Sequence, residues 1–157
     1  MKIELAKTEI IHFIGIGGIG MSGLSLIMNG KGFKTQGSDL SLNKNIERLR
    51  KEKIKIFIGH KKQNLNKATI VVVSSAIKKN NPEMIEAKRK NLPIIARGKM
   101  LAHIVSLTKN IVVVGSHGKT TTTSLVASIF QKTKLDPTII NGGVINSIQN
   151  TAKLGKS

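Results

Sequence analysis

The chain has 157 residues, 39% of them hydrophobic, which is enough for the core of one domain or of one domain plus part of another. It contains no run of about 20 apolar residues, which excludes an ordinary membrane-spanning helix, and no cysteine, which excludes disulfides and fits a cytoplasmic protein. The net charge is +18, but aromatic residues are only 3% and the lysines are scattered, so a solvated lysine-rich surface is favoured over a nucleic-acid-binding face.

The first predicted strand, Ile10–Ile14, runs directly into a glycine-rich turn, Gly15–Gly20, with the pattern G-x-G-x-x-G. A helix then carries its apolar residues on one side, and Phe33–Gly37 is the next predicted strand. This βαβ unit places Asp39 about 20 residues beyond the glycines, where a carboxylate holds a ribose hydroxyl in dinucleotide-binding folds. The pattern predicts a diphosphate site at the start of the helix. The apolar helix residues are Leu24, Ile27 and Met28.

Each part of this pattern has an alternative interpretation. The glycines could merely allow close packing of helix and strand. Asp39 could be a simple loop residue or the N-cap of the next helix. The sequence leaves these alternatives open.

Helices and strands continue to alternate up to residue 107, which predicts a parallel sheet. Ser74 and Ser75 follow a strongly apolar strand, at the edge where open α/β sheets bind ligands, but they could equally satisfy local backbone groups. His60 and His103 have no partner at metal-ligand spacing and are interpreted as structural. The predicted elements are the helices Asn43–Lys51, Asn81–Lys90 and Arg97–Leu107, the last with Leu101, Ile104 and Val105 inward, and the strands Ile54–Ile58, Thr69–Val73 and Leu92–Ile95.

A second nucleotide-type motif follows the predicted hinge at Thr108-Lys109. Ile111–Val114 is predicted to be a strand buried on both faces, and Gly118, Lys119 and Thr120 then begin a helix. Backbone N–H groups and the positive helix end face an anion in such a turn, with Lys119 reaching the outer phosphates and the Thr120 hydroxyl ligating Mg²⁺. The expected inward face of the helix is Leu125, Val126, Ile129 and Phe130.

This loop, Gly115 to Thr120, is two residues shorter than the common P-loop. The alternative is an ordinary glycine helix start with a solvated lysine. His117 is interpreted as a polar residue on the rim of the loop rather than as a catalytic group.

Two nucleotide-type sites in tandem exceed what a dehydrogenase or a plain ATPase needs. Together the motifs resemble the Mur ligases, over nearly the whole chain and in the order of that family, and the short phosphate loop is the one these ligases use. The motifs are Gly15 to Gly23, Gly37-Ser-Asp39, Gly59-His60, Ser74-Ser-Ala-Ile77, Asn81-Pro-Glu83 and Gly115 to Thr121.

The resemblance implies a cytoplasmic step of peptidoglycan synthesis. ATP, with Mg²⁺, phosphorylates the carboxylate of UDP-N-acetylmuramate, and the amine of L-alanine attacks the acyl phosphate. The first glycine loop then holds the UDP part of the substrate rather than NAD. The implied UDP-substrate residues are Gly15, Ile16, Gly17, Gly18, Ile19, Gly20, Asp39, Ser74 and Ser75. The implied ATP residues are Gly115, Ser116, His117, Gly118, Lys119, Thr120 and Thr121, with Lys119 and Thr120 catalytic and Thr120 on the metal.

The expected organisation is a Rossmann-like UDP-substrate domain over residues 1–107, followed over residues 108–157 by the incomplete beginning of a P-loop-type ATPase domain. On this reading the chain is the first third of a ligase and is catalytically incomplete by itself. In the family, the arginine at position 97 is followed by a small residue and then by an acidic one. In this chain Lys99 stands at the acidic position. The alternatives are a UDP-sugar-binding module without catalysis and an NAD-binding oxidoreductase domain. The oligomeric state is not indicated by the sequence.

Overall fold

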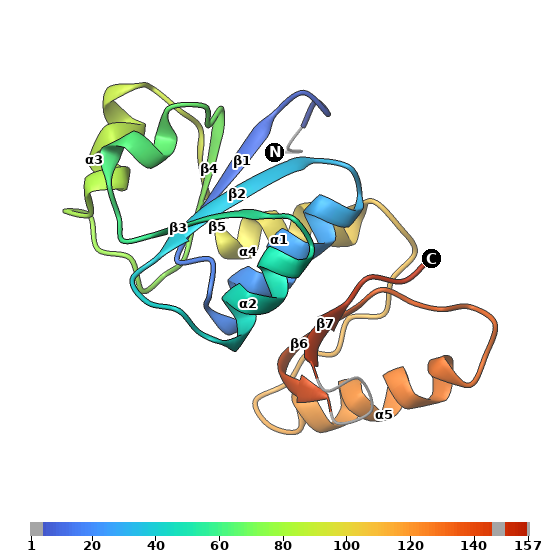
Figure 1. The fold of residues 1–157 in the computed structure, drawn as a ribbon. Coiled ribbons are helices and arrows are strands. Elements are labelled where there is room, and N and C mark those ends of the chain that lie inside the picture. Colours follow the sequence, from blue (N-terminus) through green and yellow to red (C-terminus); the bar gives the residue numbers. More distant parts are fainter. Residues whose placement is uncertain (1–4, 146–149, 157) are drawn as a thin grey trace.

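The computed structural model describes residues 5–145 and 150–156 and shows an α/β fold (Figure 1). The two predicted domains include residues 1–4, 146–149 and 157, which lie outside the described residues. The elements in chain order are β1 (Ile10–Ile14), α1 (Ile19–Gly30), β2 (Lys34–Asp39), α2 (Lys44–Lys51), β3 (Lys55–Ile58), the 3₁₀ helix η1 (Lys62–Leu65), β4 (Ile70–Val73), α3 (Pro82–Arg89), β5 (Ile94–Ala96), α4 (Arg97–Ser106), α5 (Lys119–Gln131), β6 (Ile139–Ile145) and β7 (Asn150–Lys153).

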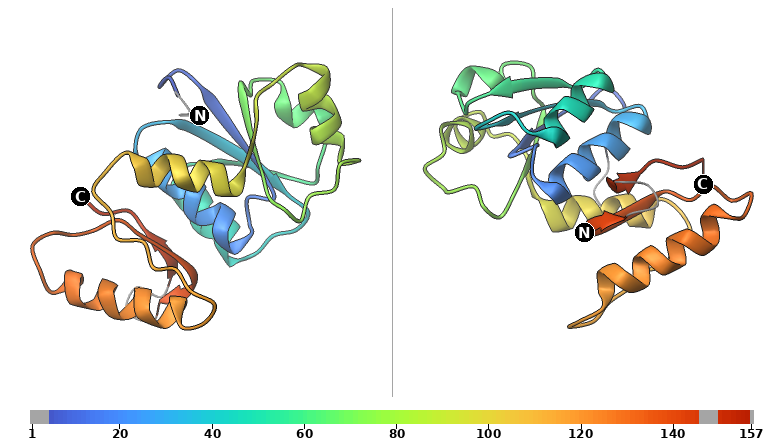
Figure 2. Two further views of the ribbon diagram at one scale, coloured as in Figure 1. Left: turned by 180° about the vertical axis from the view of Figure 1, so that it is seen from behind. Right: turned by 60° about the horizontal axis from the view of Figure 1, so that its bottom comes forward.

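The first five strands form one parallel sheet in the order β3-β2-β1-β4-β5. Helices α1, α2 and α4 cover one face, and α3 with η1 covers the other (Figures 1 and 2). The strand order reverses beside β1, because the chain first adds strands on one side of it and then adds β4 on the other. The carboxyl ends of β1 and β4 are therefore the place where such a sheet opens toward a ligand. The predicted Rossmann-like parallel sheet is confirmed.

Alternation along the central strands divides the core between the two faces. Ile11 and Phe13 of β1 face the cluster that contains α1 and α4, whereas Ile14 faces the smaller cluster under α3. The predicted apolar side of α1 is buried as expected. In α4 the prediction was partly wrong, because Met100 is fully buried and Leu101 is 36% exposed. Residues 100 and 104 lie one turn apart and share the inward face, whereas residue 101 is rotated away from it.

The C-terminal part of the chain forms a helix and an antiparallel hairpin. Helix α5 packs on β6 through Ala127 and Ile139. Strand β6 pairs with β7, and both strands of this hairpin contact α1 rather than joining the parallel sheet. The sequence did not predict this contact between the end of the chain and the first helix.

The prediction of a buried strand at Ile111–Val114 was wrong. These residues form no strand, and Ile111, Val112 and Val114 are exposed. A strand is stabilised by hydrogen bonds to neighbouring strands, and no strand of the described residues pairs with this segment. The expected inward face of α5 was partly wrong: Leu125 and Ile129 are exposed, Val126 and Phe130 are half-buried, and only Ala127 of that helix is buried.

Val72 and Val114 belong to similar β-branched runs, so substituting each of them tests whether the first run is buried and the second is exposed. Val72 is 0% exposed and Val114 is 82% exposed. We expect Val72→Ala to lower the free energy of unfolding by about 2 kcal/mol, because it leaves a cavity in the core. Val114→Ala should change it by less than about 0.5 kcal/mol. Urea unfolding of both variants measures the difference, and equal losses would contradict the exposed position of Val114.

Candidate functional site

The glycine turn after β1 is held in shape by the end of β2. The backbone N–H groups of Gly15 and Ile16 both donate to the carbonyl of Ser38, at 2.9 and 3.0 Å. Gly15 has φ +81°, a left-handed conformation that favours glycine. The N–H of Gly18 donates to Gly15 at 3.2 Å, and that of Gly17 donates to Asp39 Oδ2 at 2.8 Å. These four N–H groups shape the turn and do not point at a ligand.

The N–H groups that remain for an anion lie in the first turn of α1. The first helical bond runs from Ser22 N–H to Gly18, so Ile19, Gly20 and Met21 have no intrahelical acceptor. This turn has no acidic residue and no side-chain cap. The positive end of α1 is therefore open to a negatively charged group.

Arg97 lies across this first turn, although we did not assign it to the site from the sequence. It follows β5 at the same edge of the sheet, and its Nη1 is 2.7 Å from where a Cβ on Gly20 would be. A side chain at position 20 would displace the guanidinium. Arg97 begins the motif in which Lys99 stands at the acidic position of the family. The sequence does not show that Arg97 reaches α1, because this contact depends on where β5 lies in the sheet.

Asp39 is the last residue of β2, and both of its carboxylate oxygens already accept a hydrogen bond. Oδ2 accepts from Gly17 and Oδ1 accepts from the N–H of Leu40, each at 2.8 Å. The alternative of an N-cap is wrong, since Asn43 caps α2 by accepting from Ile46 N–H at 3.0 Å. Each carboxylate oxygen keeps a second lone pair, which leaves room for a ribose hydroxyl to donate.

The two serines at the end of β4 differ in their surroundings. Ser74 is half-buried, and its Cβ is 3.5 Å from where a Cβ on Gly15 would be. The Ser74 hydroxyl also accepts from Ala76 N–H at 3.4 Å, while Ser75 is exposed. The structure therefore places Ser74 against the glycine turn and Ser75 on the open edge beside it.

A buried polar cluster beneath this edge is centred on Glu83, in the first turn of α3. The Glu83 carboxylate is 2.5 Å from Ser38 Oγ and 2.6 Å from Asn64 Nδ2, both of which donate to it. It is also 3.4 Å from His12 Nε2 and 3.3 Å from His60 Nδ1. The side chains of Glu83 and His12 are fully buried, and that of His60 is 8% exposed, as the structural role predicted for His60 requires.

The hydrogen bonds of this cluster determine the tautomer of His12. The amide nitrogen of Gln36 donates to the carbonyl of Asn64 at 2.9 Å, so it also donates to His12 Nδ1, 3.1 Å away. His12 therefore carries its hydrogen on Nε2 and donates it to Glu83. Burial alone would raise the pKa of Glu83, but the hydrogen bonds from His12, Ser38 and Asn64 outweigh it and hold that pKa below its usual value.

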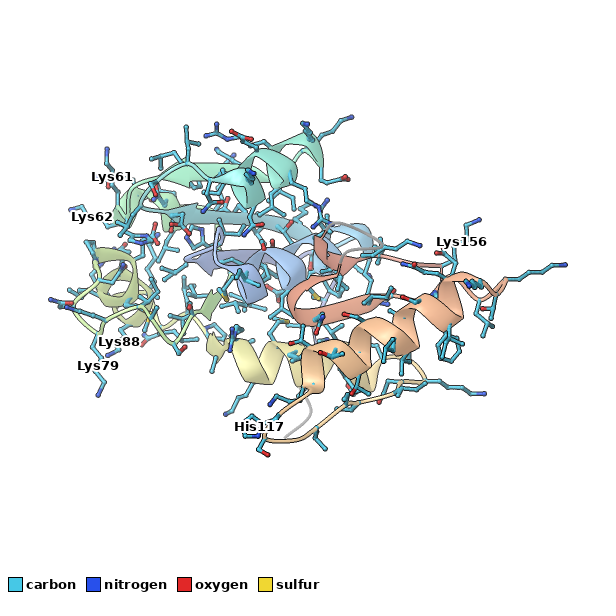
Figure 3. All side chains as sticks on the ribbon, turned by 90° about the horizontal axis from the view of Figure 1, so that it is seen from below. Lys61, Lys62, Lys79, Lys88, His117 and Lys156 are labelled. Atoms are coloured by element: carbon cyan, nitrogen blue, oxygen red, sulfur yellow. The ribbon has the colours of Figure 1, made fainter. Side chains whose placement is uncertain are left out.

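The phosphate loop lies at the other candidate site, at the start of α5. Gly118 is the N-cap residue with φ +76°, and the first turn of α5 has no acidic side chain. The Lys119 ammonium group donates to the carbonyls of Gly115 and Ser116 in its own loop. Thr120 and Thr121 are exposed, and His117 points outward from the loop (Figure 3).

This donor set fits a chain of phosphate groups, because it combines free helix N–H groups with an ammonium group. For Mg²⁺ it offers the Thr120 hydroxyl. Among the described residues, no group of three or more histidine, cysteine, aspartate or glutamate side chains could hold a metal ion.

No described helix is long and apolar enough to cross a membrane.

Five of the surface lysines are labelled in Figure 3. Lys61, Lys62, Lys79 and Lys88 come from η1, α3 and the segments before them, and Lys156 comes from the C-terminal end (Figure 3). All five point into solvent. At the two candidate sites, positive charge is supplied by Arg97, Lys119 and the N-terminal ends of α1 and α5.

Comparison with known proteins gives a consistent result. The family model described as "Mur ligase family, catalytic domain" matches residues 10–109, which span the parallel sheet and its helices. The UDP-N-acetylmuramate–L-alanine ligase of Pelagibacter ubique is 78% identical over all 157 residues, which correspond to 34% of that protein. The chain thus spans about a third of the length of this relative.

Two solved structures share the fold. The UDP-N-acetylmuramate-alanine ligase of Thermotoga maritima superposes on 94% of this chain and 35% of its own, with a TM-score of 0.85 and 33% identity. The UDP-N-acetylmuramate:L-alanyl-gamma-D-glutamyl-meso-diaminopimelate ligase of Neisseria meningitides covers 95% of this chain with a TM-score of 0.79 and 28% identity. That match extends over 48% of the Neisseria chain.

The Glu83 cluster predicts a pH-dependent stability. In Glu83→Gln an amide N–H₂ group replaces one acceptor oxygen and faces other donors, so we expect a loss of about 3 kcal/mol in the free energy of unfolding at pH 7. Because the folded-state pKa of Glu83 is lowered, its stabilisation is complete above the unfolded value near 4.5 and is lost as the pH falls through the folded value. The difference in free energy of unfolding between the unaltered chain and Glu83→Gln should therefore become smaller in acid. Urea unfolding at several pH values measures this difference.

Glu47→Gln, on the exposed side of α2, is the matched control and should cost less than about 0.5 kcal/mol. A gap for Glu83→Gln that stays constant down to acid pH would contradict an ionised Glu83 in the folded protein.

Proposed function

The chain belongs to the Mur ligase family, and from this premise we propose that it is the N-terminal part of an ATP-dependent ligase that joins L-alanine to UDP-N-acetylmuramate. The observation that carries the proposal is the 78% identity, over the whole chain, to a relative named for that reaction. The two open helix ends, one at each predicted nucleotide site, support it. The reaction is a cytoplasmic step of peptidoglycan synthesis.

In this proposal the glycine turn holds the UDP part of the sugar nucleotide. The diphosphate accepts hydrogen bonds from the free N–H groups of Ile19 and Gly20 at the positive end of α1. Arg97, which lies on Gly20, neutralises part of its charge. Asp39 accepts from a ribose hydroxyl while it continues to hold Gly17. Ser74 and Ser75 complete the edge on the side of β4.

The phosphate loop binds ATP and supports phosphoryl transfer to the muramyl carboxylate. Lys119 leaves its two loop carbonyls and stabilises the charge that develops on the transferring phosphoryl group. The Thr120 hydroxyl would hold Mg²⁺, which supplies charge neutralisation at the phosphates. The amine of L-alanine then attacks the acyl phosphate and releases phosphate.

The first test compares ligands at the glycine turn. UDP-N-acetylmuramate should raise the melting temperature of the chain more than NAD does. Arg97→Ala should weaken its binding about fivefold, since an exposed charged hydrogen bond lies at the low end of its energy range. Lys99→Ala, an exposed cation two residues further along α4, is the control and should leave the affinity unchanged. Equal or better stabilisation by NAD would refute the UDP assignment.

The second test concerns Lys119, which is exposed and bonded only within its own loop among the described residues. Lys119→Met should keep the melting temperature and weaken Mg-ATP binding at least about tenfold, measured by titration calorimetry. Lys132→Met removes the same charge at the opposite end of α5 and serves as the control. The same loss in both variants would mean that net charge, and not the loop lysine, determines the affinity.

A further inference from the structure

Strand β7 lies along one face of α1, where two glycines make room for it. Gly23 and Gly30 are seven residues apart, so they share a face of the helix two turns apart. A Cβ on Gly23 would lie 2.8 Å from the Cβ of Ala152, and one on Gly30 would overlap the side chain of Leu154. Helix α1 therefore lies close to β7 at Gly23, and the side chain of Leu154, the residue after β7, covers Gly30.

The same contact is supported from α2 and from the core. The Arg48 guanidinium donates to the carbonyl of Ala152 at 2.7 Å. Ala152 is 1% exposed and belongs to the main core cluster, against which Ile140 of β6 also packs. We call this contact, made by Gly23, Gly30, Arg48, Ala152 and Leu154, the hairpin seam.

The segment that connects the two candidate sites along the chain is not packed in this way. Residues 107–118 join α4 to α5, form no helix or strand and are exposed except for half-buried Val113. A continuous packed path runs instead through the seam. It leads from the phosphate loop along α5 to β6 through Ala127 and Ile139, then to β7, and from β7 to α1 and the glycine turn.

The seam also sets the direction of the two helices. Strand β7 and the residue that follows it run in the same direction as α1, because Ala152 meets Gly23 and Leu154 meets Gly30. The chain reverses between β6 and β7, and it reverses again between α5 and β6 (Figures 1 and 2). The N-terminal ends of α1 and α5, which carry the two candidate sites, therefore face the same side of the molecule.

We propose that the hairpin seam positions the phosphate loop relative to the glycine turn, with Gly23 and Ala152 as positioning residues. Its importance for the reaction rests on the proposed function, since a phosphoryl donor on one loop must be aligned with an acceptor held by the other. Gly23 belongs to the family motif, but no contact with the diphosphate is predicted for it. The close approach of β7 leaves no room for a side chain at this position.

The test measures the distance between the two parts of the chain. The sequence has no cysteine, so Lys88→Cys on α3 and Lys132→Cys after α5 allow two unique spin labels. The labelled chain should give one narrow distance. Gly23→Val and Ala152→Leu should each replace it with a broad distribution, while Gly98→Ala, where no atom lies within 4 Å of the added methyl group, should not.

The two seam variants should keep their affinity for UDP-N-acetylmuramate, because the glycine turn is unchanged. Circular dichroism checks that the sheet is folded, and if Gly23→Val fails to fold, Ala152→Leu decides, because the substituted residue lies on β7 and outside the parallel sheet. A distance in Ala152→Leu that is as narrow as in the unaltered chain would overturn the proposal. If the unaltered chain does not bind UDP-N-acetylmuramate, the proposed function fails, whereas the distances still decide whether the seam positions the loop.

Discussion

Ser38 is hydrogen-bonded in two directions, and the candidate site depends on both. Its carbonyl accepts from Gly15 and Ile16 and so determines the shape of the glycine turn. Its hydroxyl donates to Glu83, which also joins His12 and Asn64 beneath the sheet edge. A buried carboxylate requires several donors, and those of Glu83 on α3 come from β1, β2 and η1. The glycine turn therefore rests on a buried, hydrogen-bonded polar cluster.

Both candidate sites use the same physical device with different side chains. Each begins at a glycine before a helix whose first turn has no acidic residue, so the positive helix end is open. Arg97, the first residue of α4, reaches α1 from a distant part of the chain, whereas Lys119 lies within its own loop. The site at α1 is held by the parallel sheet on several sides. The site at α5 rests on one hairpin.

The parallel sheet, its helix order and the glycine turn were predicted from the sequence alone. They depend on short-range signals: β-branched runs, helical spacing, and glycines at strand–helix junctions. The resemblance of the motifs also predicted correctly that the chain belongs to this family and that it corresponds to about a third of a family member's length. The roles of Lys119, Thr120 and the residues around Gly15 remain predictions, although the structure places each of them at an open helix end or beside it.

Only the tertiary structure decided which of these groups meet. Ile111–Val114 has the composition of a buried strand, but burial requires a neighbouring strand, and none of the described residues supplies one. Arg97, Glu83 and the hairpin seam join residues that are 19 to 129 positions apart, as Asn64 to Glu83 and Gly23 to Ala152 show. Local patterns determine the elements of this chain. Contacts between distant segments depend on how those elements pack, because packing is a property of the whole fold and not of any one segment.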